Sequence, residues 1–394
     1  MLEIAQAQQK IHDYCQPYAR KQSSQYALAR CCNRILSGNI LCPINVPPAD
    51  NSAMDGYAVC CEDVDTIPKQ LRLSQRIAAG DEASPLSPGT AARIFTGANI
   101  PPGANAVVMQ ENCRALNGAV EILQKPNPGE NIRRAGEDLK QGTVALTKGT
   151  RLRPQHLALL ASLGIAQASV FEQVRVALIS TGEELVDPGL PLSTGKIYDS
   201  NRLMLGAAIE ALGAVIVDSR RVRDRHDDTV AALRECAQKA DLIISCGGVS
   251  AGEEDHVKNA LDALGQLHFW KINMKPGKPL AFGSIGNCIF LGLPGNPVSA
   301  FVTQFIFGGI AMRTLQGDAS PLPKPIRLAS AFTIEHARQR PEFVRVQITD
   351  KGLEMFPRQG SGVLSSVCWA DALALIPANT SVKYGQLLDT YPLQ

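Results

Sequence analysis

The strongest constraint on the fold is the alternation of short apolar runs with amphipathic segments between residues 174 and 318. Strand-like runs cover residues 174–180, 214–222, 241–246, 269–273, 280–282 and 288–293, and helix-like segments cover 200–212, 228–240, 256–264 and 298–312. Such alternation is typical of a mostly parallel sheet with helices on both faces. We therefore predict an α/β domain over residues 173–320, with its ligand beyond the carboxyl ends of the strands.

The rest of the chain indicates further domains around this one. Residues 46–140 are rich in Gly and Pro and contain strand-like runs such as 91–95 and 106–109, which predicts a β domain. Helical patterns on either side, in residues 1–45 and 141–172, predict that this β domain is inserted into a discontinuous helical linker domain. Short Val, Ile and Leu runs separated by Pro and Gly in residues 321–394 predict a small C-terminal β domain. The expected fold class is multidomain, α/β plus β.

Composition argues against several classes of protein. The formal net charge of +2 is too small to indicate nucleic acid or an acidic membrane as a partner. Residues 279–312 carry no charge, but Pro and Gly interrupt them, which favours buried strands and a buried helix over a membrane span. The eleven cysteines include no CxxC pair, and the N-terminus has no apolar signal-peptide segment. A cytoplasmic protein without nucleic-acid or membrane partners is expected.

Polar, glycine-rich segments follow the strand-like runs of the α/β region, and such turns would converge at one sheet edge. Gly247-Gly248 follows the run 241–246 and precedes a predicted helix. This arrangement lets backbone N–H groups approach a phosphate or another oxyanion. The alternative for Gly247 and Gly248 is an ordinary strand–helix turn.

Charged residues cluster in the same segments. Lys271, Lys275 and Lys278 surround a Pro-Gly turn, which suits neutralisation of a phosphate, although a solvated charge run is the alternative. Carboxylates follow or cap several strands and suggest a magnesium site that bridges substrate phosphate: Glu184, Asp224 and Asp255. Helix capping is the alternative for each carboxylate taken singly.

Eight motifs in order identify a family. The sequence resembles the MoeA-type molybdopterin molybdenumtransferases, the bacterial relatives of the gephyrin E domain. The motifs are Asp50-Asn51-Ser52-Ala53-Met54-Asp55-Gly56-Tyr57-Ala58, Thr96-Gly97-Ala98, Arg134-Ala135-Gly136-Glu137-Asp138, Ser180-Thr181-Gly182-Glu183-Glu184-Leu185, Asp199-Ser200-Asn201, the segment 247–255, Lys275-Pro276-Gly277-Lys278-Pro279 and Leu293-Pro294-Gly295-Asn296-Pro297-Val298-Ser299. They span residues 47–300, and the segment 360–373 is also similar.

The resemblance implies a helical linker domain, an inserted β domain, an α/β molybdopterin-binding domain and a C-terminal β-barrel-like domain. It implies a homodimer with an intersubunit active site. The substrates would be adenylylated molybdopterin and molybdate, a divalent cation such as Mg²⁺ would assist, and the products would be molybdenum cofactor and AMP. It also implies the adenylyltransferase of the same pathway as a partner.

Site residues follow from the resemblance position by position. The expected catalytic set is Asp55, Thr96, Asp138, Glu184, Asp224, Asp255, Lys271 and Lys275, with Glu184, Asp224 and Asp255 as metal ligands. The expected substrate-binding set is Gly247, Gly248, Ser250, Lys278, Pro294, Pro297, Arg345 and Ser365. Asp55, Thr96 and Asp138 would come from the second subunit. Position 371 is Asp where relatives often have Asn, and position 183 is Glu where many have Asp.

Two other functions stay open. One is adenylylation of molybdopterin by ATP on the same α/β fold, and the additional domains argue against it. The other is a non-catalytic scaffold like gephyrin at synapses, and the retained Asp55, Glu184 and Asp255 argue against that. In the favoured reading, lysines and backbone N–H groups offset the repulsion between two anionic substrates, and the carboxylates hold the cation.

Overall fold

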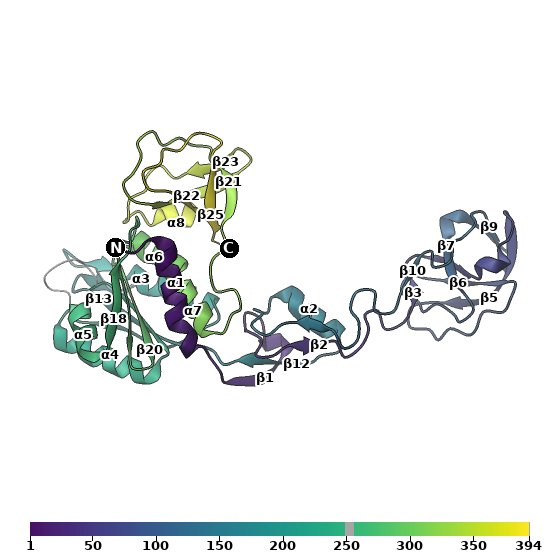
Figure 1. Cartoon of the computed structure of the whole chain (residues 1–394), viewed down its shortest axis with the longest axis horizontal. Coiled ribbons are helices and arrows are strands. Elements are labelled where there is room, and N and C mark those ends of the chain that lie inside the picture. The colour runs from purple at the N-terminus through teal and green to yellow at the C-terminus, as the bar shows by residue number, and fades with distance from the viewer. Residues whose placement is uncertain (249–255, 394) are drawn as a thin grey trace. The chain divides into compact units, whose positions relative to one another are not determined.

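The computed structural model describes residues 1–248 and 256–393. It forms two compact units, which we call the large unit and the small unit. The large unit comprises Met1–Gly38, Lys148–Arg153 and Ala168–Gln394, and the small unit comprises Asn39–Thr147 and Pro154–Gln167. Figure 1 labels the elements of both units.

A six-stranded sheet forms the centre of the large unit. Its order is β16-β13-β17-β20-β19-β18. The first four strands run parallel, and β19 and β18 are antiparallel to their neighbours. The strands are β13 (Arg175–Thr181), β16 (Val215–Val222), β17 (Leu242–Cys246), β18 (Gln266–Lys271), β19 (Pro279–Ile285) and β20 (Cys288–Leu293). This confirms the predicted mostly parallel sheet.

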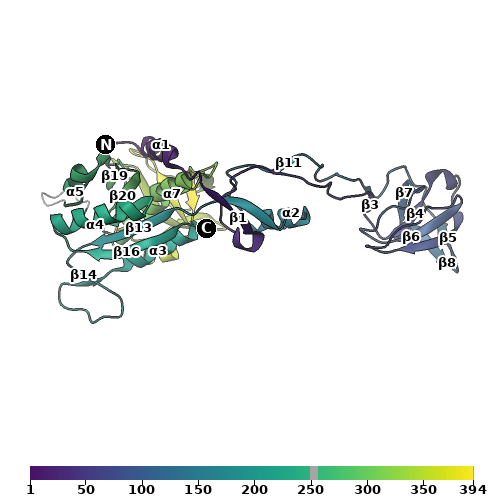
Figure 2. The same cartoon turned by 90° about the horizontal axis from the view of Figure 1, so that it is seen from below.

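Helices cover both faces of this sheet because successive strand residues point to opposite sides. In β13, Val176 and Leu178 belong to one hydrophobic core, and Ala177 and Ile179 belong to the other. The first core includes residues of α1 (Ile4–Cys15), α3 (Ser200–Ala211), α6 (Pro297–Thr303) and α7 (Gly309–Leu315). The second includes residues of α4 (His226–Lys239) and α5 (His256–Leu264), which lie side by side in Figure 2.

The expected helical character of residues 1–45 is wrong beyond Cys15. Pro17 lies in a short 3-10 turn after α1, and β1 (Ser23–Ala27) then pairs with β12 (Gln167–Phe171). Helical structure within the expected 141–172 segment is confirmed at α2 (Pro154–Ser162). Proline cannot continue an α-helix, and the Ser-Ser-Gln-Tyr run after it lacks a helical apolar repeat.

The uncharged stretch is confirmed as strands followed by a core helix. Pro297–Leu315 is long and apolar enough to cross a membrane, but 83% of its most apolar window is buried inside the structure. A π-helical turn, Gln304–Gly308, separates α6 from α7, and the Gln304 side chain occupies the space beside Gly308. Burial by protein on this scale is the property of a core helix.

The C-terminal part of the large unit is a five-stranded antiparallel sheet of order β21-β25-β24-β22-β23, and its buried core includes Val344, Leu353 and Ala374. An isolated β-bridge between the backbones of Lys275 and Glu342 links this part to the α/β part. Its elements are β21 (Ile326–Ala329), β22 (Glu342–Thr349), β23 (Gly352–Met355), α8 (Ser365–Trp369), β24 (Ala372–Ile376) and β25 (Leu387–Pro392).

The small unit contains a six-stranded sheet of order β7-β4-β6-β5-β9-β8, with apolar cores on both faces. Its strands are β4 (Gly56–Val59), β5 (Lys69–Ile77), β6 (Thr90–Ile94), β7 (Ala106–Met109), β8 (Cys113–Leu116) and β9 (Ala119–Ile122). The strand-like runs at 91–95 and 106–109 are confirmed by β6 and β7. Short pairs join β2 (Ile40–Leu41) to β11 (Val144–Leu146), and β3 (Asn51–Ser52) to β10 (Ile132–Arg133).

Candidate active site

A polar cavity of about 660 Å³ lies at the carboxyl ends of the parallel strands in the large unit. Thr181 at the end of β13, Cys246 at the end of β17 and Pro294 just after β20 all line it. A second wall comes from β14 (Leu185–Val186), β15 (Ile197–Tyr198) and the start of α3. The position and size are those of a small-molecule site in an open α/β sheet.

The two glycines at 247 and 248 let three chain segments meet at the base of the cavity. Gly247 has φ +91° and Gly248 has φ +66°, both in the left-handed region. A Cβ at Gly247 would lie 2.5 Å from the carbonyl oxygen of Thr181. The Gly247 N–H donates to the Leu293 carbonyl at 3.2 Å. Neighbouring backbone therefore already pairs with this N–H, and Gly247 permits the close approach of the segments; substrate binding by Gly247 and Gly248, which both line the cavity, stays a prediction.

Gly247→Ala is expected to lower the free energy of unfolding by about 2–4 kcal/mol, because an unfavourable φ and a backbone clash add together. Gly286→Ala is the matched control: it also has a positive φ, +57°, but nothing lies within 4 Å of its Cβ position. That control should cost about 1 kcal/mol. Urea unfolding of both variants checks this, and equal losses would mean that the contact with Thr181 does not matter.

A buried network holds the cavity wall at the start of α3. Asp199 caps this helix: its carboxylate accepts from the Arg202 backbone N–H at 3.1 Å and from the Ser180 hydroxyl at 2.7 Å. Arg202 also forms an ion pair with Asp199 at 3.1 Å. The side chain of Asn201 follows directly and donates to the Gly295 carbonyl at 2.7 Å. These bonds fix the segment Asp199–Asn201 beside the ends of β13 and β20.

Two of the three expected metal ligands, Glu184 and Asp224, line this cavity. The third, Asp255, lies outside the described residues, as does the expected substrate-binding residue Ser250. Among the described residues, no three His, Cys, Asp or Glu side chains form a cluster that could hold a metal ion. Glu184 and Asp224 supply carboxylate oxygens, the donors that Mg²⁺ prefers, so their chemistry fits the expected cation.

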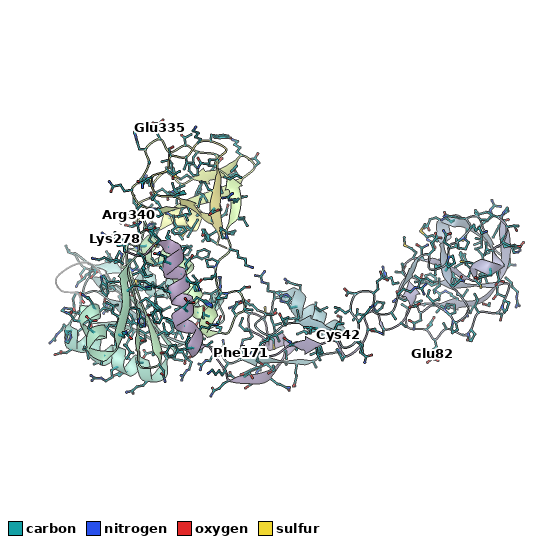
Figure 3. The ribbon with its side chains drawn as sticks, viewed as in Figure 1. Cys42, Glu82, Phe171, Lys278, Glu335 and Arg340 are labelled. Carbon is teal, nitrogen blue, oxygen red and sulfur yellow. The ribbon has the colours of Figure 1, made fainter. Side chains whose placement is uncertain are left out.

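The expected lysines do not line this cavity, within the part of the chain that is described. Lys271 is the last residue of β18, and its Cα pairs with that of Pro279. Lys275 Nζ lies 3.5 Å from Glu342 Oε1, and Figure 3 labels Lys278 and Arg340 on the two segments that meet there. Of the other expected substrate-binding residues, Pro294 and Pro297 line the cavity.

Basic residues gather around Lys275, beside the fully buried Glu342; we call them the basic cluster and define it as Lys275, Arg338, Arg340 and Arg345. Arg338 forms an ion pair with Glu342. Partial burial, followed by the positive charges of Arg338, Arg340 and Arg345, lowers the pKa of Lys275. Lys275 and Arg338 pair with this one carboxylate, and Arg340 and Arg345 add positive charge near Lys275, so the excess of positive charge favours an anion.

Arg345 is the most deeply buried cation of the basic cluster, with no exposed surface. Its guanidinium donates to the Ser366 hydroxyl at 3.1 Å and to the carbonyls of Phe343 and Gly360 at 3.3 Å. None of these acceptors is charged, and burial lowers the pKa of Arg345 to about 10. The hydroxyl that Arg345 contacts belongs to Ser366, and the substrate-binding role expected for the neighbouring Ser365 stays a prediction. Gly362 and Leu364, which lie between Gly360 and Ser366 in the sequence, line the cavity.

Glu342→Gln is expected to lower the free energy of unfolding by about 1–2 kcal/mol, because it removes the buried carboxylate that pairs with the partly exposed Arg338 and Lys275. Glu335→Gln, at an exposed position labelled in Figure 3, is the control and should change stability by less than about 0.5 kcal/mol. Urea unfolding measures both. A neutral effect of Glu342→Gln would show that the basic cluster does not depend on this carboxylate.

In the small unit, the structure brings together two of the three expected residues. Asp55 Oδ1 accepts from the Thr96 N–H at 2.8 Å and from the Thr96 hydroxyl at 2.7 Å. These hydrogen bonds lower the pKa of the exposed Asp55 carboxyl, so it stays ionised. Asp138 is exposed, and its backbone N–H donates to the Val46 carbonyl; among the described residues, no hydrogen bond or ion pair joins its side chain to Asp55.

Sequence reasoning missed Glu342, Arg338 and Arg340 as neighbours of Lys275. Glu342 follows Pro341 within a run that alternates basic and polar residues, and nothing in that pattern indicates a buried carboxylate. It also left out Thr181 and Asn201 as individual site residues, although both belong to motifs that carry the resemblance. Both residues line the cavity.

Comparisons with known proteins agree with this architecture. Residues 2–164 match the family described as "MoeA N-terminal region (domain I and II)", residues 177–308 match "Probable molybdopterin binding domain", and residues 327–393 match "MoeA C-terminal region (domain IV)". The chain is 43% identical to the molybdopterin molybdenumtransferase of Haemophilus influenzae, over 81% of this chain and 78% of that protein. It is 37% identical to the molybdopterin molybdenumtransferase of a Nostoc species, over 87% and 82%.

A solved structure extends the likeness over the whole length. The crystal structure of the molybdopterin biosynthesis MoeA protein from Pyrococcus horikoshii OT3 is 26% identical and matches with a TM-score of 0.84, covering 100% of both chains. The fold of this chain is therefore that of the solved MoeA protein. This chain belongs to the MoeA family.

Proposed function

We propose that this protein is a molybdopterin molybdenumtransferase, which inserts molybdate into adenylylated molybdopterin and releases AMP. The relatives that carry this name support the reaction class and make the protein a transferase of molybdenum-cofactor synthesis. The observation that carries the proposal is the pairing of a polar cavity with the adjacent basic cluster, whose buried Arg345 contacts only neutral acceptors among the described residues.

Electrostatics gives each part of the site a role. Both substrates are anions, and like charges repel strongly where water is partly excluded. The basic cluster offsets that repulsion for one of them, molybdate, beside the cavity that would hold the pterin and its phosphates. Lys275, partly exposed, repelled by three arginines and sharing Glu342 with Arg338, is the group that we expect to meet the oxyanion. Lys271 and Lys278 would add to the same positive field.

Mg²⁺ belongs to this proposal through the carboxylates at the cavity. Glu184 and Asp224 would hold it, with Asp255 as the third expected ligand. When bound, the cation supplies positive charge that neutralises substrate phosphate and polarises the phosphoanhydride. Without a cation, two carboxylates in a phosphate site would oppose binding, so their presence in the cavity supports this assignment.

A homodimer with an intersubunit site is the second part of the proposal. Asp55, Thr96 and Asp138 belong to the small unit, whereas the cavity and the basic cluster belong to the large unit. The resemblance implies that the small unit of one subunit serves the cavity of the other. An apolar groove of about 400 Å³ beside α3, α6 and the C-terminal residues, lined by Met204, Phe301, Phe305 and Leu393, supports association through the large unit.

The proposed location is the cytoplasm, and the proposed supplier of adenylylated molybdopterin is a partner adenylyltransferase.

A direct assay separates the proposal from its alternatives. Purified protein is incubated with adenylylated molybdopterin, Mg²⁺ and molybdate, and AMP is followed by chromatography. Molybdate-dependent release of AMP is the expected result. Consumption of ATP with free molybdopterin would point to adenylyltransferase activity, and no reaction in either assay would point to a scaffold.

A further inference from the structure

Arg93 of β6 is hydrogen-bonded to the chain segments that meet at Asp55 in the small unit. Its Nη1 donates to the Gly56 carbonyl at 2.9 Å, and its Nη2 donates to Gln110 Oε1 at 2.7 Å. The Gln110 backbone N–H in turn donates to the Asp55 carbonyl at 3.1 Å. We propose that Arg93 is a positioning residue, which fixes the place of the Asp55 carboxylate for the reaction. This inference rests on the proposed function, because that function gives Asp55 its part in the reaction.

The antiparallel pairing of three strands brings these segments together. β4 lies between β6 and β7 (Figure 2), and its first residue, Gly56, pairs with the last residue of each neighbour. In antiparallel pairs the start of one strand lies beside the end of the next. Asp55, which precedes β4, therefore lies beside Thr96 and Gln110, which follow β6 and β7.

Two aromatic rings hold the Arg93 guanidinium in place. Its Cζ lies 5.0 Å from the ring centre of Tyr57 and 4.6 Å from that of Phe95. Tyr57 is buried, and its Cα pairs with that of Arg93 across β4 and β6. A planar guanidinium stacks on rings and presents its donors in a rigid fork, which the compact ammonium group of a lysine lacks. The two ring contacts and the two hydrogen bonds together restrict Arg93 to one placement.

The Asp55 carboxylate needs such a connection because it is exposed, and Thr96, which donates both of its hydrogen bonds, is exposed as well. Those bonds join the two residues to each other, whereas Arg93 joins the backbone around Asp55 to the middle of the sheet. The hydrogen bonds from Thr96 lower the pKa of Asp55 most, and the positive charge of Arg93 lowers it further. Position and charge are separable effects, because lysine keeps the charge of Arg93 and loses the fork.

The test compares steady-state AMP release by full-length Arg93→Met, Arg93→Lys and Arg76→Met. Methionine still packs on rings but removes the charge and the donors. Arg76 is the matched control: its Cζ lies 4.5 Å from the same Phe95 ring centre, and its Cα pairs with that of Arg93. In the described part of the chain, however, no hydrogen bond joins its side chain to the segments around Asp55. Gln110→Met, at an exposed position, removes one acceptor of Arg93 and should fold like the wild type.

Arg93→Met is expected to lower kcat by about 10- to 100-fold, because a displacement of about 1 Å at a reacting group has an effect of this size. Arg93→Lys should lower kcat by at least about fivefold, since charge without the fork does not hold the segments. Gln110→Met should lower it by about threefold, and Arg76→Met should stay within about twofold of the wild type. The KM for molybdate should change by less than about twofold in all four variants, because the proposed molybdate site belongs to the large unit.

A double variant distinguishes positioning from a general effect on the fold. In protein that already carries Asp55→Asn, Arg93→Met should lower kcat further by less than about twofold, because the effects of residues that act as a unit do not add. General damage to the small unit would instead lower the rate by the same factor with and without Asp55→Asn. Equal factors would therefore overturn the inference, and so would wild-type kcat in Arg93→Lys or equal effects of Arg93→Met and Arg76→Met.

A readout without substrate separates this inference from the proposed function. The carboxyl carbon of Asp55 is followed by NMR in protein with labelled aspartate, and its signal is assigned from its absence in Asp55→Asn. Both Arg93 variants should raise the pKa of Asp55, because a displaced segment weakens the hydrogen bonds from Thr96, and Arg76→Met should leave it unchanged. If the wild type releases no AMP but both Arg93 variants raise this pKa, the proposed function fails and the positioning of Asp55 stands. A rise in Arg93→Met alone would reduce Arg93 to a charge and overturn the inference.

Discussion

Asp55→Asn is expected to lower molybdate-dependent AMP release by about 1000-fold while leaving the fold intact. Asparagine keeps an oxygen that can accept both hydrogen bonds from Thr96, at 2.8 and 2.7 Å, so the loop geometry should persist. What disappears is one negative charge. Charged groups that act on the reacting atoms contribute about 10²- to 10⁴-fold to rate, which sets the expected size.

Asp50→Asn is the matched control, because it removes a carboxylate from the same unit in a similar environment. Asp50 accepts from the Ala135 N–H at 2.8 Å and from Arg134 at 2.6 Å, and these bonds also lower its pKa. We expect Asp50→Asn to keep AMP release within about threefold, since its carboxylate already has a structural partner. If Asp55→Asn released AMP as fast as Asp50→Asn, Asp55 would have no role in the reaction.

The lowered pKa of Asp55 also sets the direction of a pH effect. A carboxyl group with a depressed pKa stays ionised even at the pH values where a free aspartate becomes protonated. It loses its charge only as the pH falls through the lowered pKa. The contribution of Asp55 should therefore be constant above about pH 5, where a free aspartate is already ionised, and should fall only at lower pH. Thr96→Val removes one of the two hydrogen bonds to Asp55. It should therefore shift the loss of activity at acidic pH to a higher pH.

The α/β part of the fold was predictable because local patterns and tertiary packing agree there. The predicted helix at 256–264 coincides with α5, and the predicted strand at 288–293 coincides with β20. Strand-end segments were expected to converge, and the cavity confirms this for Thr181, Gly247 and Pro294. Topology alone carries that inference, since the carboxyl ends of parallel strands share one edge.

The basic cluster was not predictable in the same way. Lys275 and Glu342 lie far apart in sequence, and their contact depends on how the C-terminal sheet packs against the α/β part. Local pattern says nothing about such a contact, and Glu342 belongs to a residue type that is rarely fully buried. The contact between Arg345 and Ser366 was hidden for a similar reason, because the register of a short helix decides which hydroxyl faces Arg345.

Lys275→Ala is expected to lower AMP release by at least about 100-fold at low molybdate concentration, chiefly by raising the KM for molybdate. Partial burial and then the positive charges of three arginines lower the pKa of Lys275, and a bound oxyanion would stabilise the ammonium group against both. Stability should fall by only about 1 kcal/mol, because the side chain is 53% exposed and Glu342 keeps its ion pair with Arg338.

A steady-state titration with molybdate measures the effect of Lys275→Ala. Lys239→Ala is the control: this lysine lies at the end of α4, 3.9 Å from Asp218, and its loss changes the net charge of the same unit equally. Lys275→Arg keeps the charge and should recover part of the activity, whereas the alanine variant should respond to higher molybdate. A cation that contacts molybdate in the enzyme–substrate complex must affect the affinity of the enzyme for molybdate. An unchanged KM for molybdate in Lys275→Ala would therefore show that the basic cluster does not bind the oxyanion.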